Sequence, residues 1–434
     1  MRQTMIRAFL ALLLAAMAPS LFAGVTIETW TAPSGAKVFY VAARALPILD
    51  VQVDFPAGSA FDPADKPGVA GLTRSLLDNG ADGLDEDSIA RKLADLGAHM
   101  GGGADGERAS VTLRTLSEAD KSGPALAIMA TVMRAPTFPD GVVERERDRA
   151  IAGLKDALTR PDTIAGRAFV RALYGSHPYA RQSTPESLAA IGRADLVDFH
   201  RRHYVAGRAV VTVVGDVDRA GAERIAQELT AGLPVGSGAA ALPPVSLPAA
   251  GEERIAHPAA QAHVLLGLPA MRRGDPDFFP LVVGNYVLGG GGFVSRLMQE
   301  VREKRGYAYS VYSYFAPSRD LGPFQIGLQT KREQVGEAMK VVDEVLKKFL
   351  AEGPTADELK AAKANVVGSF PLRLDSNRKI LENVATIGFY GLPLDWLDTY
   401  RGKAAAVSIE QIRDAFARRV RPENLMTVIV GPGA

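Results

Sequence analysis

The 434-residue sequence contains no cysteine, which excludes disulfides, thiolate metal sites, a cysteine nucleophile and a lipidated cysteine. It also lacks an excess of charge, because 50 basic residues face 49 acidic ones. We therefore expect no nucleic-acid partner and no attraction to an anionic membrane. With 47% hydrophobic residues, a chain of this length is typical of a globular protein with at least two domains.

Histidine is scarce, with six residues, and none belongs to a His-x-x-Glu-His or His-x-x-x-His pair. His200 and His203 lie three residues apart at an expected helix end. Arg201 and Arg202 stand between them, and no carboxylate is adjacent. We interpret the pair as a solvated helix terminus rather than a metal site. A Gly-x-Ser-x-Gly motif for a nucleophilic serine is also absent.

The N-terminus has the features of a secretory signal. Arg2 and Arg7 precede an apolar run at 8–18, and the segment closes on the small residue Ala23. This pattern predicts a signal peptide at 1–23 and a periplasmic protein. The run of about eleven residues is short for a membrane span, which takes about 20, so we expect no stable membrane insertion. An uncleaved anchor is the alternative.

A charge-free stretch rich in proline, glycine and alanine at 232–251 predicts a linker between two domains. The segments on either side, 24–231 and 252–434, look like diverged copies. The first ends with FHRR and then AVVTVVGD, starting at Phe199. The second ends with FARR and then LMTVIVGP, starting at Phe416, about 216 residues later.

Hydrophobic periodicity predicts strands and helices in both halves. The expected strands are 51–55, 109–116, 262–268 and 307–315. The expected helices are one marked by Val69, Leu72 and Leu76 and others at 121–133, 140–158, 279–287, 293–305, 334–350 and 355–368. This order indicates an α+β fold: two homologous lobes, each a mostly antiparallel sheet with helices on one face.

The segment 289–315 is the most informative. Gly289, Gly290, Gly291 and Gly292 precede no Gly-Lys-Ser/Thr, so they do not form a nucleotide-binding loop. We interpret them as a flexible loop that lets another backbone, such as a peptide, approach closely. With Tyr307 they are our candidate substrate-binding residues.

An apolar helical stripe, ended by Gly306, is predicted next, followed by a tyrosine-rich strand. We expect Tyr309 to share a face of this strand with Tyr307 and Val311. The predicted stripe consists of Val294, Leu297, Met298 and Val301.

Residues 290–311, with the run Arg302-Glu-Lys-Arg-Gly-Tyr-Ala-Tyr-Ser-Val311, resemble the C-terminal lobe of the pitrilysin family of zinc metallopeptidases. That family includes insulin-degrading enzyme and the mitochondrial processing peptidases. The resemblance extends to Tyr174-Gly-Ser-His-Pro-Tyr179, Thr184-Pro-Glu186 and Glu358-Leu-Lys-Ala-Ala-Lys363. It implies two α+β lobes arranged as half of a clamshell.

The resemblance also shows what this chain has lost. Gly71, Arg74 and Ser75 stand where the family has the histidines and glutamate of His-x-x-Glu-His, and Ala152 falls where its third ligand, a glutamate, is expected. Because zinc needs three protein donors, we expect this chain to bind no zinc and no other cofactor.

A second family element is retained. Arg302 and Tyr309 match an arginine and a tyrosine, seven residues apart, that in the family reach toward the peptide at the zinc. A guanidinium and a phenol both donate hydrogen bonds, which suits them to peptide carbonyls and to a developing oxyanion.

These residues predict the non-zinc-binding subunit of a heterodimeric periplasmic peptidase. The partner, a homologous His-x-x-Glu-His subunit, would supply zinc, and this chain would supply Arg302 and Tyr309 for hydrolysis of peptides. It would be inactive alone. The alternatives are a structural or regulatory subunit, or a peptide-binding, chaperone-like homodimer with no catalytic role.

Overall fold

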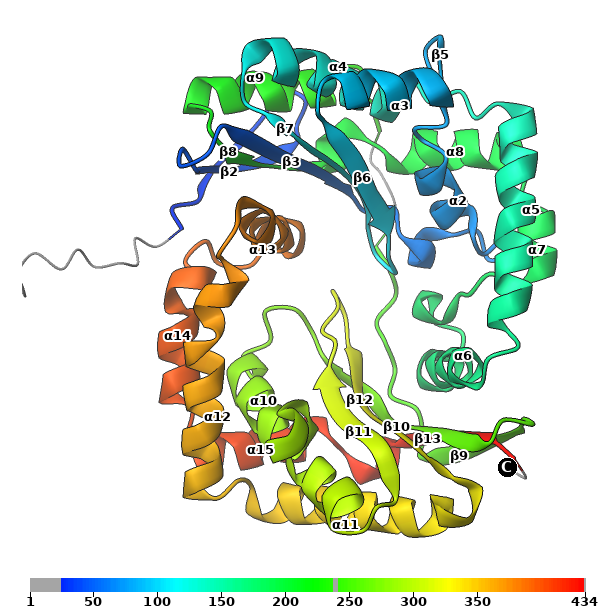
Figure 1. Ribbon diagram of the computed structural model, residues 1–434, viewed down its shortest axis with the longest axis vertical. Coiled ribbons are helices and arrows are strands. Elements are labelled where there is room, and N and C mark those ends of the chain that lie inside the picture. Colours follow the sequence, from blue (N-terminus) through cyan, green and yellow to red (C-terminus); the bar gives the residue numbers. More distant parts are fainter. Residues whose placement is uncertain (1–24, 237–240, 433–434) are drawn as a thin grey trace, which may run out of the picture.

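The computed structural model describes residues 25–236 and 241–432, which form two lobes that face each other (Figure 1). The predicted signal peptide lies outside the described residues. Each lobe is built on one large sheet with helices packed against it. None of the helices in the described ranges is long and apolar enough to cross a membrane.

The N-terminal lobe contains a six-stranded sheet in the order β1-β2-β8-β3-β7-β6. Its strands are β1 (Glu28–Thr31), β2 (Lys37–Ala42), β3 (Ile48–Phe55), β6 (His99–Ala104), β7 (Ala109–Leu116) and β8 (Val210–Gly215). Its helices are α2 (Val69–Ser75), α3 (Glu86–Asp95), α4 (Ala119–Arg134), α5 (Asp140–Ala157), α6 (Pro161–Tyr174), α7 (Pro185–Ala189), α8 (Arg193–His203) and α9 (Arg219–Thr230). A small hairpin pairs β4 (Gly80–Ala81) with β5 (Leu84–Asp85).

The C-terminal lobe contains a five-stranded sheet in the order β11-β12-β10-β13-β9. Its strands are β9 (Gly251–Ala256), β10 (Gln261–Met271), β11 (Ala308–Phe315), β12 (Gly322–Lys331) and β13 (Met426–Gly431). Its helices are α10 (Phe278–Asn285), α11 (Val335–Glu352), α12 (Ala356–Gly368), α13 (Asn377–Tyr390), α14 (Trp396–Ala406) and α15 (Ile409–Arg419).

The two sheets repeat one topology. In each, a long central strand pairs antiparallel with both neighbours, and the last strand of the lobe pairs parallel with the next one outward. The apolar runs starting at Ala209 and Leu425 form equivalent strands, β8 and β13. The predicted α+β fold with two mostly antiparallel lobes is confirmed. The boundaries 24–231 and 252–434 remain a prediction.

Each sheet packs its outer face on helices of its own lobe. Val51 and Val53 of β3 pack among α4, α8 and α9, and Val264 and Leu266 of β10 pack among α10, α11 and α15. Alternation along a strand turns the intervening side chains to the inner face, the face directed toward the other lobe.

Helices from the opposite lobe partly cover these inner faces. Helix α13, from the C-terminal lobe, packs on Phe39 and Val210 of the N-terminal sheet. Helix α6, from the N-terminal lobe, packs Phe169 on the C-terminal sheet, beside Val428. The lobes therefore hold each other through an exchanged pair of helices, as Figure 1 shows.

Glycine permits both of these close approaches. A Cβ on Gly388 of α13 would lie 2.7 Å from ring carbons of Phe39, and a Cβ on Gly267 of β10 would lie 3.0 Å from the ring of Phe169. Such distances are too short for carbon atoms, so a side chain at either position would push a helix off its sheet.

A buried carboxylate also joins the lobes. Glu107, in the turn between β6 and β7, is 5% exposed and accepts hydrogen bonds from the hydroxyls of Tyr179 and Tyr390. The backbone N–H of Arg319, from the β11–β12 turn, donates to the same carboxylate at 2.9 Å. Tyr390 and Arg319 belong to the C-terminal lobe, so this one side chain binds both lobes.

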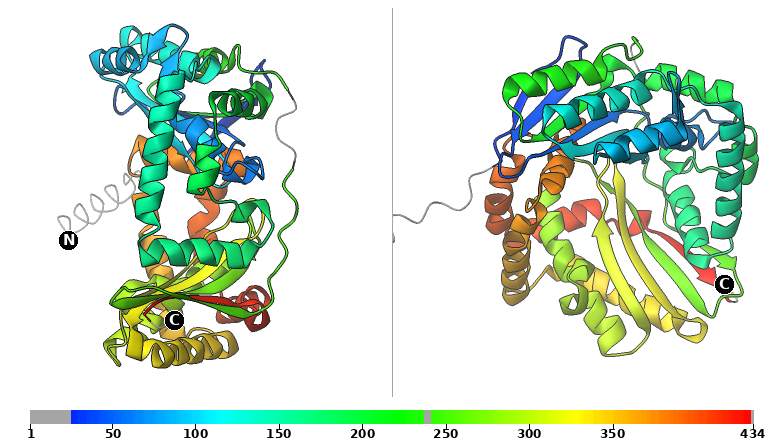
Figure 2. Two further views of the ribbon diagram at one scale, coloured as in Figure 1. Left: turned by 90° about the vertical axis from the view of Figure 1, so that its right-hand side faces the viewer. Right: turned by 45° about the horizontal axis from the view of Figure 1, so that its top comes forward.

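Residues 241–250 of the predicted linker follow one side of the molecule between the lobes (Figure 2) and form no helix or strand. The Pro243 carbonyl accepts from His177 at 2.8 Å, the Val245 N–H donates to Asp320 at 2.7 Å, and the Pro248 carbonyl accepts from Asn424 at 2.6 Å. This stretch of the chain is therefore fixed to both lobes.

Substituting Gly388→Ala should destabilise the protein by about 1–3 kcal/mol, because the new methyl group would overpack the contact with Phe39. Gly402→Ala is the matched control, since Gly402 lies within α14 with nothing within 4 Å of its Cβ position. Alanine there should stabilise by about 0.5–1 kcal/mol through helix propensity alone. Urea denaturation measures both. An equal increase in the free energy of unfolding for Gly388→Ala and Gly402→Ala would contradict the close contact of α13 with the sheet.

Candidate functional site

The degenerate zinc-motif positions lie on α2, whose N-terminus is fixed by a buried aspartate. Asp62 accepts hydrogen bonds from the backbone N–H groups of Gly68, at 2.7 Å, and Ala70, at 2.6 Å. These bonds satisfy free donors at the start of the helix. Burial raises the pKa of the Asp62 carboxyl to about 6, although both hydrogen bonds oppose this shift.

Arg74 fills the place of the family's catalytic glutamate, and its side chain is buried, with 6% exposed. Its Nε donates to the Ser110 carbonyl of β7 at 2.5 Å, and its Nη2 donates to the Gly101 carbonyl of β6. Burial lowers the pKa of the guanidinium. Arg74 therefore ties α2 to the edge of the sheet with a fixed positive charge.

The other three degenerate zinc-motif positions also offer no metal ligand. Gly71 and Ser75 lie one turn apart on the exposed side of α2, and Ala152 is exposed on α5. Their side chains carry no imidazole or carboxylate, and the nearby Arg74 repels a cation. No three histidine, aspartate or glutamate side chains gather as a metal site would require in residues 25–236 and 241–432. These positions do not fit zinc.

The interpretation of His200 and His203 as a solvated helix terminus is wrong. Both are buried, with 7% and 8% exposed. His200 Nε2 lies 2.7 Å from the Met133 carbonyl, and the His203 ring stacks on Phe199 at 4.2 Å. The last turn of α8 packs into the N-terminal lobe, so the intervening Arg201 and Arg202 face solvent while the imidazoles fill the core.

Arg302 and Tyr309 are brought together as the resemblance implies. The guanidinium carbon of Arg302 lies 4.9 Å from the ring centre of Tyr309 and 4.8 Å from that of Phe293. Two aromatic faces therefore flank the cation, an arrangement that fixes its orientation. Glu303 also contacts Arg302, at 3.4 Å. Tyr309 is 76% exposed, so its hydroxyl is free to meet a ligand.

A β-bulge determines the direction of Tyr309. Ala308 pairs with Thr330 and Ser310 pairs with Gln329, which leaves Tyr309 as an extra residue without a partner on β12. The expectation that Tyr309 shares a face with Val311 is wrong, because Val311 is buried beneath the sheet while Tyr309 is exposed. Period-two alternation cannot anticipate an inserted residue.

The four glycines precede β11 and pack closely against their own chain. A Cβ on Gly289 would lie 2.4 Å from Ser313 Oγ, one on Gly290 2.7 Å from Asn285, and one on Gly291 2.6 Å from the Tyr286 carbonyl. Gly292, with φ of 60°, has open space around it. The close backbone approach expected here is thus made within the protein, and contact with a peptide remains a prediction.

The helix expected at 293–305 is interrupted. A short 3₁₀ turn spans Gly292–Val294, and a π-helical turn follows at Met298–Glu303. Leu297, Met298 and Val301 are buried as predicted, but Val294 is 66% exposed. Tyr307, a candidate for substrate binding, packs at the border of the C-terminal core.

Sequence reasoning missed two features of this region. Phe293, 61% exposed, was predicted only as the first residue of a helix at 293–305, although it forms one wall of the Arg302 site. The second is a polar surface on β11 and β12. The tyrosine-rich alternation of β11 was the available signal for it.

Comparison with known proteins agrees with this fold and site. Residues 38–184 match the family described as "Insulinase (Peptidase family M16)", and residues 190–366 match "Peptidase M16 inactive domain". The crystal structure of a peptidase M16 inactive domain from Pseudomonas fluorescens is 38% identical, with a TM-score of 0.91 over 94% of this chain and 99% of that chain. The chain therefore belongs to peptidase family M16, the insulinase or pitrilysin family.

Relatives in this family carry contrasting descriptions. A Bacillus subtilis protein described as an uncharacterized zinc protease, YmxG, is 25% identical over 94% of this chain and 98% of its own length. A Helicobacter pylori protein described as a non-peptidase homolog is 26% identical, with 91% of each chain covered. The lost ligands of α2 agree with the second description and with the inactive-domain match.

Arg74→Glu, which reinstates the family's residue, should destabilise the protein by about 3–5 kcal/mol. The substitution would place a buried carboxylate against the carbonyl oxygens of Gly101 and Ser110, which repel it. Arg74→Met is the control, because it keeps the length but removes the charge, and it should cost roughly 1–2 kcal/mol. Equal stability of the two variants in urea denaturation would rule out the proposed bonding of Arg74.

His203 should make the stability depend on pH. Burial, with a contribution from Arg202, lowers the pKa of His203 to about 4, whereas an unfolded histidine titrates near 6.5. The unfolded chain therefore binds this proton first as the pH falls. The stabilisation is complete above about pH 6.5 and is lost progressively toward pH 4, by roughly 3 kcal/mol at most.

Comparing the free energy of unfolding at pH 7 and pH 4.5 tests this expectation. His203→Gln should reduce the loss between the two pH values, and His99→Gln, at an exposed position on β6, should leave it unchanged. Asp62, whose pKa is raised by burial, shifts stability in the opposite direction, so the difference between variant and wild type is the informative quantity. Parallel profiles for wild type and His203→Gln would contradict the assignment.

Proposed function

We propose that this chain is the non-zinc-binding subunit of a heterodimeric metallopeptidase and supplies Arg302 and Tyr309 to a homologous partner that carries His-x-x-Glu-His. The observation that carries the proposal is an asymmetry between two sites. The four zinc-motif positions are without ligands and Arg74 bonds α2 to the sheet there, while Arg302 and Tyr309 remain paired and Tyr309 is exposed.

The proposed role follows from the chemistry of this pair. A solvent-exposed phenol held against a guanidinium offers several hydrogen-bond donors to one substrate oxygen. In the heterodimer, Tyr309 and Arg302 would bind the carbonyl of the peptide bond that the partner's zinc centre cleaves, and would stabilise the negative charge that develops on its oxygen. This chain's own residues thus bind and polarise the peptide.

The edge strands support a role in peptide binding. β6 and β11 each end their sheet, so their free backbone groups are available to an extended chain. β6 contains Gly101, Gly102 and Gly103, which place no side chain of their own over its backbone. We place the complex in the periplasm on the basis of the N-terminal signal pattern.

Tyr309→Phe should reduce kcat of the assembled heterodimer about 100- to 1000-fold, because it removes one donor to the transition state. Peptide hydrolysis by the co-expressed pair is the assay, and size-exclusion chromatography checks that assembly is unchanged. Tyr286→Phe, which removes a hydroxyl near the glycines outside the site, should keep wild-type turnover. Full activity of Tyr309→Phe would assign the chain a structural or regulatory role instead.

The isolated chain gives a second test. Purified alone, it should hold no stoichiometric zinc by metal analysis and should not hydrolyse peptides, and activity should appear only on addition of the partner. Zinc-dependent hydrolysis by the chain alone would overturn the proposed division of labour.

A further inference from the structure

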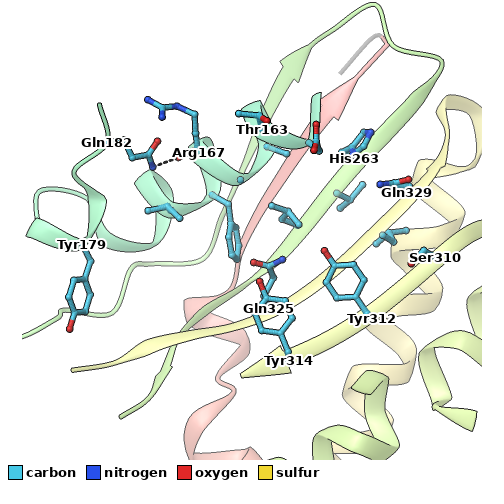
Figure 3. A pocket seen from close by; sticks show the side chains of 18 of the residues that line it. Thr163, Arg167, Tyr179, Gln182, His263, Ser310, Tyr312, Tyr314, Gln325 and Gln329 are labelled. Carbon is cyan, nitrogen blue, oxygen red and sulfur yellow. Dashed lines mark hydrogen bonds between the residues drawn. The ribbon is translucent and has the colours of Figure 1, made fainter. Parts of the chain in front are cut away.

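A cavity of about 580 Å³ lies between α6 and the inner face of the C-terminal sheet (Figure 3). Its floor carries Ser310, Tyr312 and Tyr314 of β11 with Gln325 and Gln329 of β12, and α6 lies above it. This volume is within the range of ligand pockets in proteins. Neither the zinc-motif positions nor Arg302 lines the cavity.

The polar floor lacks partners within the protein. Across residues 25–236 and 241–432, the side chains of these five residues make no hydrogen bond or ion pair. Gln325 is the clearest case, because it is only 9% exposed and its amide faces the cavity. Its amide atoms are not enclosed by protein, so water in the cavity can bond to them until a ligand takes its place.

The N-terminal lobe provides an internal comparison, since its sheet has the same topology. On its inner face the long polar side chains bond to one another. Gln52 donates to Asp54 at 2.8 Å, and Arg114 donates to Asp50 at 2.8 Å. The equivalent surface of the C-terminal lobe keeps its donors and acceptors available. The two lobes share one topology, so this topology does not explain why polar side chains are paired on one inner face and unpaired on the other.

The spacing of the floor matches an extended peptide. Gln325, Gly327 and Gln329 alternate on one face of β12, at about 7 Å per step. The ring of Tyr312 lies over Gly327, where a Cβ would come within 2.5 Å of it, and stacks beside Tyr314 with ring centres 6.0 Å apart. Along β12 the Gln325 amide, the ring of Tyr312 and the Gln329 amide therefore follow one another at the spacing of every second residue in an extended peptide.

The cavity and the proposed site share strand β11. Ser310, on the cavity floor, directly follows Tyr309. A peptide that reaches the hydroxyl of Tyr309 can therefore continue along β11 onto the floor. The five floor residues carry no charge, and the charged lining residues Asp162, Arg167 and Arg181 come from the N-terminal lobe.

We propose that this cavity is a second peptide-binding subsite, which holds an extended segment remote from the bond to be cleaved. Gln325 and Gln329 bond to main-chain amide and carbonyl groups of the segment, and it packs on the ring of Tyr312. The inference rests on the proposed function, because it takes peptides as the ligands of this chain. It extends that function by separating anchoring from transition-state stabilisation.

Binding to the isolated chain tests the subsite. The probe is a fluorescein-labelled ten-residue peptide of alanine, serine, glycine and asparagine with a capped C-terminus, followed by fluorescence anisotropy. Gln325→Leu should weaken binding about tenfold, the effect of one lost pair of hydrogen bonds. The same variant should fold with equal or higher thermal stability, because leucine removes an unpaired amide. Gln227→Leu, at an exposed position on α9, should bind as wild type does.

Unchanged affinity of Gln325→Leu, or no binding of the probe by the wild type, would overturn the subsite. These outcomes are independent of turnover in the heterodimer. If Tyr309→Phe loses turnover and Gln325→Leu binds the probe normally, the proposed function holds and the subsite is wrong. If Gln325→Leu binds the probe weakly and Tyr309→Phe keeps full turnover, the subsite is supported and the catalytic role of Tyr309 is wrong.

Discussion

The exchange of α6 and α13 between the lobes is the constraint on which the rest of the molecule depends. Each sheet buries its outer face within its own lobe, but each inner face needs a helix from the other half of the chain. Gly388 and Gly267 allow the helices to approach, and Glu107 bonds to both lobes beside them. Residues far apart in the sequence are thereby held in fixed positions around the space between the two sheets.

This two-lobed structure explains how the zinc ligands can be lost while the pair of Arg302 and Tyr309 persists. The zinc-motif helix α2 belongs to the N-terminal lobe, and its position is set by Asp62 and by the bonds of Arg74 to β6 and β7. Arg302 and Tyr309 are positioned within the C-terminal lobe by the π-helical turn and the bulge of β11. Because the two sites depend on different local structures, losing the ligands of one leaves the geometry of the other intact.

Much of the architecture could be predicted from the sequence, because it depends on local patterns. Strand β7 was predicted with its observed bounds, 109–116, since its buried and exposed residues alternate without interruption. The helix predicted at 140–158 is α5 within one residue. The lost zinc ligands were visible as Gly71, Arg74 and Ser75, because a helical motif keeps its spacing even when its residues change.

The errors arose where tertiary contacts decide the outcome. The burial of His200 and His203 depends on α8 packing against partners distant in the sequence, and charged neighbours concealed it. The outward direction of Tyr309 depends on one unpaired residue in the ladder with β12. The role of Phe293 as a wall for Arg302, and the polar floor on β12, required the fold itself.

Arg74 has a consequence for the history of this chain. A guanidinium bonded to two backbone carbonyls makes the loss of the zinc motif part of what stabilises the fold. Restoring one ligand at a time would pass through intermediates that neither bind zinc nor keep α2 in place. A zinc-binding sequence is thus separated from this one by several simultaneous changes, so the loss of the metal ligands, once made, is hard to reverse.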